Sequence, residues 1–257
     1  MDLIADHISH RFGALDVLDD VSFAVRAGEV VAIVGPSGCG KSTLLSILGG
    51  LLQPSKGAAE LRGAAPAGSL NPLTFVFQDF ALLPWCTVEQ NVEFPLENTG
   101  LSPGERRAVI DDALRRTGLT DFRGAWPKQL SGGMRQRVGI ARALAVRPAI
   151  LLMDEPLSAL DSQTRELLME DFVRLLADGA MGAVYVTHNL EEAVRLADRI
   201  VVLSRRPGRV QETVTIPMTR GERGAVEARS RLITLQNDLW SLIRKEAIDA
   251  EREVQHA

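Results

Sequence analysis

The residues best suited to chemistry lie in a glycine-rich segment between an apolar run and a helical pattern. GPSGCGKST fits G-x-x-x-x-G-K-[ST] in full, and the preceding EVVAIV is typical of a strand buried on both faces. Glycines let backbone N–H groups turn inward around phosphate oxygens, and the N-terminus of the following helix adds its dipole. A chance glycine-rich turn is the alternative, which this strand-and-helix context disfavours. The predicted phosphate-binding residues are Gly35, Pro36, Ser37, Gly38, Cys39, Gly40, Lys41, Ser42 and Thr43.

Four side chains are expected to supply the chemistry of phosphoryl transfer. Lys41 would reach the β- and γ-phosphates, and the Ser42 hydroxyl would ligate Mg²⁺. AILLMDEP reads as a buried strand that ends beside the phosphate loop, where Asp154 can hold Mg²⁺ through water. Glu155 follows directly and suits a base that polarises the attacking water. A solvated turn residue is the alternative for Glu155.

These residues need alternating strands and helices to position them. The order strand–helix–strand from the AILLMDEP run onward predicts a parallel sheet covered by helices. The stretch 86–145 has helical spacing and reads as a mostly helical insertion. Further strands are expected at 3–9, 17–25, 29–34, 73–77, 182–188, 199–204 and 211–216, with helices near 162–177 and 190–197.

Composition excludes several classes of protein. The 257 residues, 46% of them hydrophobic and 24% charged, suit one α/β domain with appendages. The net charge of −4 gives no basic footprint, so we expect no nucleic-acid partner. Two cysteines cannot form a disulfide framework or a zinc site alone. We see no secretory signal and no apolar run of about 18 residues, so work at a membrane would need a partner.

The segment Leu130-Ser131-Gly132-Gly133-Met134, which ends 20 residues before Asp154, narrows the class. With it the chain resembles the ATP-binding cassette (ABC) ATPases, over roughly residues 2–215, whereas the GTPase motif N-K-x-D is missing. The resemblance implies an α/β fold with a P-loop NTPase core, an antiparallel β subdomain and a helical subdomain at about 86–145. It also implies an ABC ATPase domain over 1–215, followed by a C-terminal helical tail over 216–257.

The resemblance assigns further roles in the family's order. Gln78 matches the glutamine that contacts Mg²⁺ and the attacking water, and His188 matches the switch histidine that senses the γ-phosphate. Phe12 lies where the family places an adenine-stacking aromatic, more often Tyr. Asp161, which ends SALD, matches the D-loop and is counted with the nucleotide-binding residues. Taken singly, each has an ordinary alternative: a surface glutamine, a strand end, a core aromatic, or a helix N-cap region for Asp161.

In this family two chains face each other head to tail. ATP on one phosphate loop is covered by the partner's Ser131, Gly132 and Gly133, so neither chain has a complete site alone. The resemblance therefore implies a second ATPase subunit, expected to be a second copy of this chain, with a heterodimer left open. Two departures stand out: Met134 replaces the usual Gln, and Asn189 follows the histidine where Asp is common.

The region of about Phe80 to Pro95 is where such ATPases grip a membrane subunit. Leu82 to Trp85 form an apolar cluster that could anchor a partner helix or belong to the helical subdomain's own core. LLPW, LSGGMRQRV and RRPGRV together resemble the importer group for nitrate, sulfonate, taurine and pyrimidine precursors. That resemblance implies a multi-span permease, an extracytoplasmic solute-binding protein and a peripheral position on the cytoplasmic face of the bacterial inner membrane. Lipid or lipoprotein extraction at the membrane is the alternative to import. The sequence does not identify the transported solute.

Cys39 is the one reactive side chain expected inside the phosphate loop. It lies at a helix N-terminus beside Lys41, and both should lower the pKa of its thiol. An inert small filler is the alternative interpretation. A lowered pKa predicts inhibition by thiol alkylators and protection by ATP.

Overall fold

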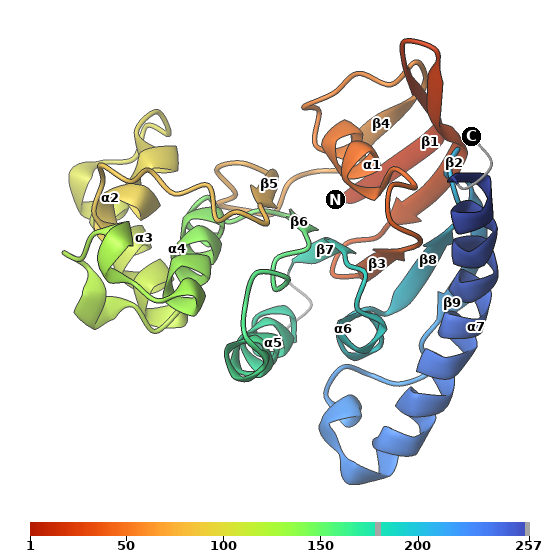
Figure 1. Cartoon of the computed structure of the whole chain (residues 1–257). Helices are drawn as coiled ribbons and strands as arrows, with labels where there is room; N and C mark the ends of the chain where they lie inside the picture. The colour runs from red at the N-terminus through yellow and green to blue at the C-terminus, as the bar shows by residue number, and fades with distance from the viewer. Residues whose placement is uncertain (178–180, 255–257) are drawn as a thin grey trace. The chain divides into compact units, whose positions relative to one another are not determined.

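The computed structural model describes residues 1–177 and 181–254 (Figure 1). Its contacts divide the chain into two compact units, one of residues 1–64 with 173 onward and one of residues 65–172. Within the described residues, no helix is long and apolar enough to cross a membrane.

A mostly parallel sheet forms the centre of the first unit. β3 (Val30–Val34) is buried along its whole length, as its unbroken apolar sequence predicts. It pairs in parallel with β7 (Gly182–Val186) on one side and β8 (Arg199–Leu203) on the other. β9 (Val210–Thr215) adds an antiparallel edge to β8. The carboxyl ends of β3 and β7 thus lie at one edge of the sheet, which is where the phosphate loop and the His188 segment begin.

The first unit also has a three-stranded antiparallel sheet in the order β2-β1-β4. β1 (Asp2–Phe12) is the central strand, between β2 (Leu15–Val25) and β4 (Lys56–Arg62). Its register shifts around His7, which has a φ of 50°. A Cβ on Gly57 would lie 2.2 Å from the carbonyl oxygen of His7, so glycine is needed there. β4 was not predicted from the sequence, because KGAAELR contains several small residues and shows no alternation of apolar and polar positions. Most of its residues are exposed in the structure.

Three helices complete the first unit: α1 (Lys41–Leu48), α6 (Leu190–Leu196) and α7 (Arg229–Val254). α7 packs on α6, and the single-turn helices Glu222–Gly224 and Val226–Ala228 lead into it. Arg223 is 5% exposed and donates to backbone carbonyls on both sides, among them Met218 at 2.7 Å and Ala197 at 2.6 Å. Burial lowers the pKa of Arg223 to about 10, although the nearby Asp198 carboxylate opposes that shift.

The second unit consists of two parallel strands and a group of helices. β5 (Leu73–Val76) pairs with β6 (Ile150–Asp154). α2 (Val88–Glu93), α3 (Pro103–Arg116) and α4 (Gly132–Ala145) follow β5, with single-turn helices at Phe94–Leu96, Thr120–Phe122 and Pro127–Gln129. α5 (Ser162–Leu176) begins in this unit.

The start of two of these helices is encoded locally, and their apolar faces make one core. Thr87 with Gln90, and Ser102 with Glu105, form capping boxes at the start of α2 and α3. The Ser102 hydroxyl and backbone N–H stabilise the ionised Glu105, which lowers its pKa. The core of α2, α3 and α4 contains Val88, Val92, Leu96, Val109, Ile110, Ala113, Leu114, Leu119, Leu130, Val138, Ala141, Ala145 and Val146.

Candidate nucleotide site

The phosphate loop connects the end of β3 to the start of α1. Gly40, the residue before the helix, has a φ of 106°, and a Cβ there would lie 2.8 Å from Cδ2 of Leu18. Gly40 therefore suits both the left-handed backbone and the close packing against Leu18. It has no side chain that could accept a hydrogen bond from the first turn of α1, where other helices have a capping side chain. This arrangement fits phosphate oxygens.

Lys41 is drawn back into the loop that precedes it. Its ammonium nitrogen donates to the carbonyl oxygens of Gly35 at 2.9 Å and Pro36 at 3.0 Å, and the residue is 7% exposed. A buried ammonium needs such partners. Ser42 and Thr43 follow in the first turn of α1. A cation and a hydroxyl thus stand at the helix N-terminus, as a phosphate and metal site requires.

Cys39 does not have the environment predicted from the sequence. Its side chain is 1% exposed, and burial raises the pKa of the thiol above its ordinary value. The positive charge of Lys41 acts in the opposite direction but is the smaller effect. The expectation of a lowered pKa was wrong because burial outweighs the neighbouring cation. The alternative interpretation, a small buried filler, agrees with this environment.

Phe12 ends β1 and presents its ring to solvent. It is 52% exposed, and its ring lies against the buried His10 ring at a centroid distance of 4.6 Å and an interplanar angle of 78°. An exposed aromatic ring can stack on a planar base. The core alternative for Phe12 does not agree with this exposure.

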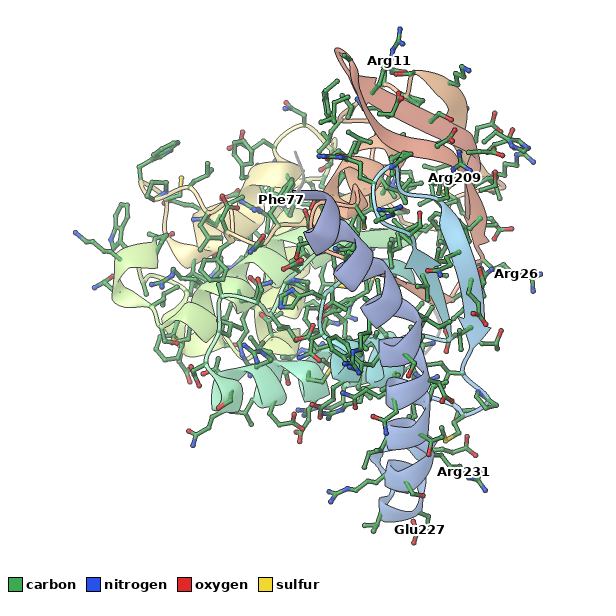
Figure 2. All side chains as sticks on the ribbon, turned by 45° about the vertical axis from the view of Figure 1, so that its right-hand side comes forward. Arg11, Arg26, Phe77, Arg209, Glu227 and Arg231 are labelled. Carbon is green, nitrogen blue, oxygen red and sulfur yellow. The ribbon has the colours of Figure 1, made fainter. Side chains whose placement is uncertain are left out.

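A pocket of about 510 Å³ lies on the same sheet and has a polar lining that includes Ser9, Arg11, Lys56 and Arg209. Two of its arginines, Arg11 and Arg209, do not point toward each other (Figure 2). Arg11 extends into solvent away from Arg209 in Figure 2. Arg209 forms an ion pair with Asp19.

The backbone on either side of His188 is held by a buried carboxylate. Tyr185 and Thr187 both donate a hydroxyl hydrogen bond to Oε2 of Glu192, each at 2.8 Å. The Thr187 hydroxyl also accepts the N–H of Asn189 at 2.9 Å, so the residues before and after His188 are fixed. Glu192 is 5% exposed. Glu192 was not predicted from the sequence. The one available signal is its position as a carboxylate in the first turn of the helix that follows a buried strand.

The structure accounts for Asn189. Its Oδ1 accepts the N–H groups of Glu191 at 2.9 Å and Glu192 at 3.4 Å, which makes Asn189 the N-cap of α6. An N-cap needs only an acceptor oxygen, and Asn and Asp supply it about equally well. Asn in place of the more common Asp therefore keeps the helix start intact.

In the second unit, the ends of β5 and β6 bring three predicted residues to one edge. Val76 pairs with Met153, so Gln78, two residues after β5, and Asp154, the last residue of β6, lie at the carboxyl ends of neighbouring parallel strands. Glu155 comes next, with a φ of 42° that non-glycine residues rarely adopt. Its carbonyl accepts both the N–H of Ser158 at 3.1 Å and the Ser158 hydroxyl at 2.9 Å. Such strained backbone is concentrated at functional sites.

Ser131, Gly132 and Gly133 form the N-terminal end of α4. The Ser131 hydroxyl oxygen accepts the N–H of Met134 at 3.3 Å, and Ser131 itself is exposed. A Cβ on Gly133 would lie 2.3 Å from Cγ2 of Thr164, so glycine lets α4 approach α5 closely. The Met134 side chain packs on the core of α2, α3 and α4, which explains an apolar residue at this position.

Asp161 lies beside the first turn of α5. Its Oδ1 accepts the N–H of Thr164 at 3.0 Å, and this bond lowers the pKa of Asp161. The helix N-cap role weighed for this residue is therefore present in the structure. A capping carboxylate can still face a second subunit, because Asp161 is exposed.

The apolar cluster after Gln78 divides into an inward and an outward part. Leu82 packs on the helical core, and Leu83 is held by the buried Asn91, which accepts its N–H at 2.8 Å and donates to its carbonyl at 3.1 Å. Trp85 is 70% exposed, and Phe94 nearby in the chain is 52% exposed. The core interpretation thus agrees with Leu82, and the partner-anchor interpretation stays a prediction for the exposed Trp85.

The donor set fits magnesium bound together with a nucleotide. Among the described residues there is no group of three or more His, Cys, Asp or Glu that could hold a metal alone. Mg²⁺ commonly takes one or two protein oxygens, with phosphates and waters as its other ligands. The Ser42 hydroxyl in the first unit is a ligand of that kind, and so, in the second unit, are the Asp154 carboxylate and the Gln78 amide oxygen.

Comparison with known proteins identifies the family. Residues 18–158 match the family model described as ABC transporter. The chain is 39% identical over 252 residues to an ATP-binding protein of Brucella abortus (98% of this chain, 96% of that protein). It is 47% identical over 200 residues to the taurine import ATP-binding protein TauB of Burkholderia pseudomallei (78% and 77%).

A solved structure agrees with this result. The ATP-binding cassette MJ0796, in a dimeric post-hydrolysis state bound to ADP and Pi, superposes with a TM-score of 0.72 at 34% identity. The superposition covers 84% of this chain and 99% of that one. The chain belongs to the ABC transporter family as an ATP-binding subunit with the ABC ATPase fold, an ATPase coupled to transport.

Proposed function

We propose that this chain is the ATP-hydrolysing subunit of a bacterial ABC importer for nitrate, a sulfonate, taurine or a similar small solute. The observation that supports ATP binding most strongly is the glycine-started α1, with Lys41 held in the loop before it. The similarity to a taurine import subunit supports the importer group. We keep the ABC ATPase domain over 1–215, with a helical subdomain at about 86–145 and a helical tail over 216–257, as part of the proposal.

Each predicted residue has a part in binding and hydrolysis. The loop from Gly35 to Thr43 binds the phosphates, and Phe12 stacks on adenine. Gln78 orients the water that attacks the γ-phosphorus, and Glu155 accepts a proton from that water. The bond from the γ-phosphorus to the β–γ bridging oxygen breaks, so that ADP and phosphate are the products. His188 donates a hydrogen bond to the γ-phosphate. Ser42, Asp154 and Gln78 would hold Mg²⁺, which would supply positive charge against the phosphate oxygens.

The second half of each site comes from a second copy of the chain. Ser131, Gly132 and Gly133 at the start of α4 present a hydroxyl and backbone N–H groups to the γ-phosphate of the partner's ATP. The exposed Asp161 approaches the same dimer interface. ATP then holds the two chains together, and hydrolysis separates them.

The dimer drives a separate multi-span permease, fed by an extracytoplasmic solute-binding protein. Contact with the permease runs through about Phe80 to Pro95, with the exposed Trp85 as an apolar anchor. The chain works at the cytoplasmic face of the bacterial inner membrane as a peripheral subunit. Lipid or lipoprotein extraction at the membrane is the second candidate function, because it uses the same ATPase and the same kind of docking surface.

Copurification from native membranes tests the importer assignment. We would purify the tagged chain from detergent-solubilised membranes with Mg·ATP and identify its partners by mass spectrometry. We expect a multi-span permease and a solute-binding protein with the wild type, and loss of both with Trp85→Ala. Trp126→Ala, which removes a less exposed tryptophan of the same unit, is the matched control and should retain them. Recovery of a lipid-handling complex, or of soluble proteins alone, would contradict the importer assignment.

A further inference from the structure

Two consecutive non-glycine residues after Gln78 have left-handed backbone. Phe80 has a φ of 63° and Ala81 a φ of 45°. L-residues with a Cβ adopt this conformation at a cost in free energy, and adjacent instances persist only where the surroundings enforce them. The two residues lie between Gln78, which we place in the ATP site, and Trp85, which we place in the permease contact.

Side chains on one face of α4 hold Phe80 and Ala81 in this left-handed conformation. Arg142 donates to the carbonyl oxygen of Ala81 at 2.6 Å and to that of Phe80 at 3.2 Å, so one guanidinium holds both strained residues. The guanidinium of Arg135 lies over the Phe80 ring, 5.6 Å from its centroid. Between them, a Cβ on Gly139 would lie 3.4 Å from the Phe80 carbonyl oxygen. Residues 135, 139 and 142 are four and three positions apart, which places them on one side of a helix.

Ser131 is the N-cap of this same helix, so α4 contacts the Phe80–Ala81 loop and also starts at the residue that we place against the partner's ATP. Arg135 also donates to the carbonyl of Leu130 at 2.7 Å, immediately before the exposed Ser131. α4 therefore connects the loop that contains Gln78 to the end that we place against the partner's ATP. Burial lowers the pKa of Arg142 from its ordinary value, which agrees with a guanidinium drawn partly out of water.

We propose that Arg142 is a positioning residue, which holds Phe80 and Ala81 left-handed so that Gln78 is placed for hydrolysis and its loop moves as one with the Ser131 end of α4. This inference rests on the proposed function of Gln78 and Ser131. Arg142 itself touches neither nucleotide nor metal. It acts through the backbone of the loop.

A substitution and its rescue test the proposal. Arg142→Met keeps an unbranched apolar stem and removes the donors, so we expect kcat for ATP hydrolysis to fall about tenfold with KM for ATP within about threefold. Glycine adopts left-handed backbone without the Cβ cost, so Ala81→Gly should restore at least about a third of the lost activity in the Arg142→Met background. Glycine at position 81 could not repair a defect confined to helix stability.

The matched control is Arg137→Met. Arg137 also lies on α4 and also donates to a backbone carbonyl, that of Thr117 at 3.1 Å, but it contacts Asp171 and not the loop. Hydrogen exchange of the amides between Gln78 and Trp85 gives a readout independent of activity. We expect exchange there to accelerate about tenfold in Arg142→Met and to stay at the wild-type rate in Arg137→Met.

The outcomes separate this inference from the proposed function. Unchanged exchange in Arg142→Met, or loss of activity that Ala81→Gly does not restore, overturns the positioning role. If Gln78→Ala leaves kcat unchanged, the assigned role of Gln78 fails, whereas faster exchange in Arg142→Met would still support the clamp on the loop. Should Arg142→Met fail to fold, Arg142→Lys, which keeps a donor, is measured in the same way. Its kcat and its exchange rate are expected to lie between those of the wild type and the values given above for Arg142→Met.

Discussion

The hydrogen bonds of Thr187 are expected to stabilise both the fold and the His188 segment. Thr187→Val removes a hydroxyl that donates to the Glu192 carboxylate at 2.8 Å and accepts the N–H of Asn189 at 2.9 Å. A hydrogen bond to a charged group contributes about 1.5–3 kcal/mol, and an N–H left without a partner costs a further 1–3 kcal/mol. Valine recovers part of this through apolar burial, so we expect a net loss of about 3 kcal/mol in the free energy of unfolding.

The assay is thermal unfolding followed by circular dichroism, together with ATP hydrolysis. For a chain of this size, 3 kcal/mol lowers Tm by about 6–12 °C. Tyr185→Phe, which removes only a donor to the same carboxylate, should cost about half as much. We also expect kcat to fall about tenfold in Thr187→Val, because His188 lies between the two residues that lose their bonds.

Thr234→Val is the matched control, because Thr234 is exposed on α7 and bonds only to the carbonyl of Ser230 in its own helix. Its stability should stay within about 0.5 kcal/mol of the wild type. A Thr187→Val protein that lies within the same range and hydrolyses ATP normally would refute the reasoning.

Three further predictions concern other charged or reactive groups. Arg223→Met should lower the free energy of unfolding by about 3 kcal/mol, measured in urea, because buried carbonyls lose their donor; a loss under about 1 kcal/mol would contradict this. Iodoacetamide at about pH 7.5 should modify the half-buried Cys86 before Cys39, whose pKa is raised; peptide mass spectrometry showing the reverse order would count against it. The hydrogen bond that the His7 ring donates to the Asp20 carboxylate raises the pKa of His7, so the stabilisation is present below the unfolded pKa and is lost as pH rises through the folded pKa. Asp20→Asn, which tolerates the same left-handed backbone, should therefore lower Tm more at about pH 5.5 than at about pH 8.5, and an equal difference at both would exclude the linkage.

Segments with strong local patterns could be predicted from the sequence. The unbroken apolar run at Val30–Val34 and the glycine-rich turn after it determine a buried strand and a helix start within a few residues. The phosphate-loop residues were predicted in the same way, by motif and spacing, whereas His188 was predicted from the family resemblance; their roles stay predictions. β4 could not be predicted, because its exposed residues are ordered by pairing with β1 and not by their own pattern.

What depends on contacts distant in the chain could not be derived from the sequence. The environment of Cys39 was misjudged, because its burial depends on the residues that pack around the loop. The Arg142 contact with Ala81 joins residues 61 positions apart, and no local pattern indicates the left-handed backbone at Ala81. Glu192 was missed because a glutamate on a short helix usually faces solvent.

The central claim is that two copies of this chain enclose ATP between them, and its most direct test is the mass of Glu155→Gln in solution. This variant should bind ATP without hydrolysing it, and multi-angle light scattering measures its mass directly. With Mg·ATP we expect about twice the monomer mass of 27.9 kDa, and with ADP the monomer mass. The double variant with Lys41→Ala, which weakens binding of the phosphates, should stay monomeric. A monomeric Glu155→Gln protein at a Mg·ATP concentration shown to saturate it would contradict the account.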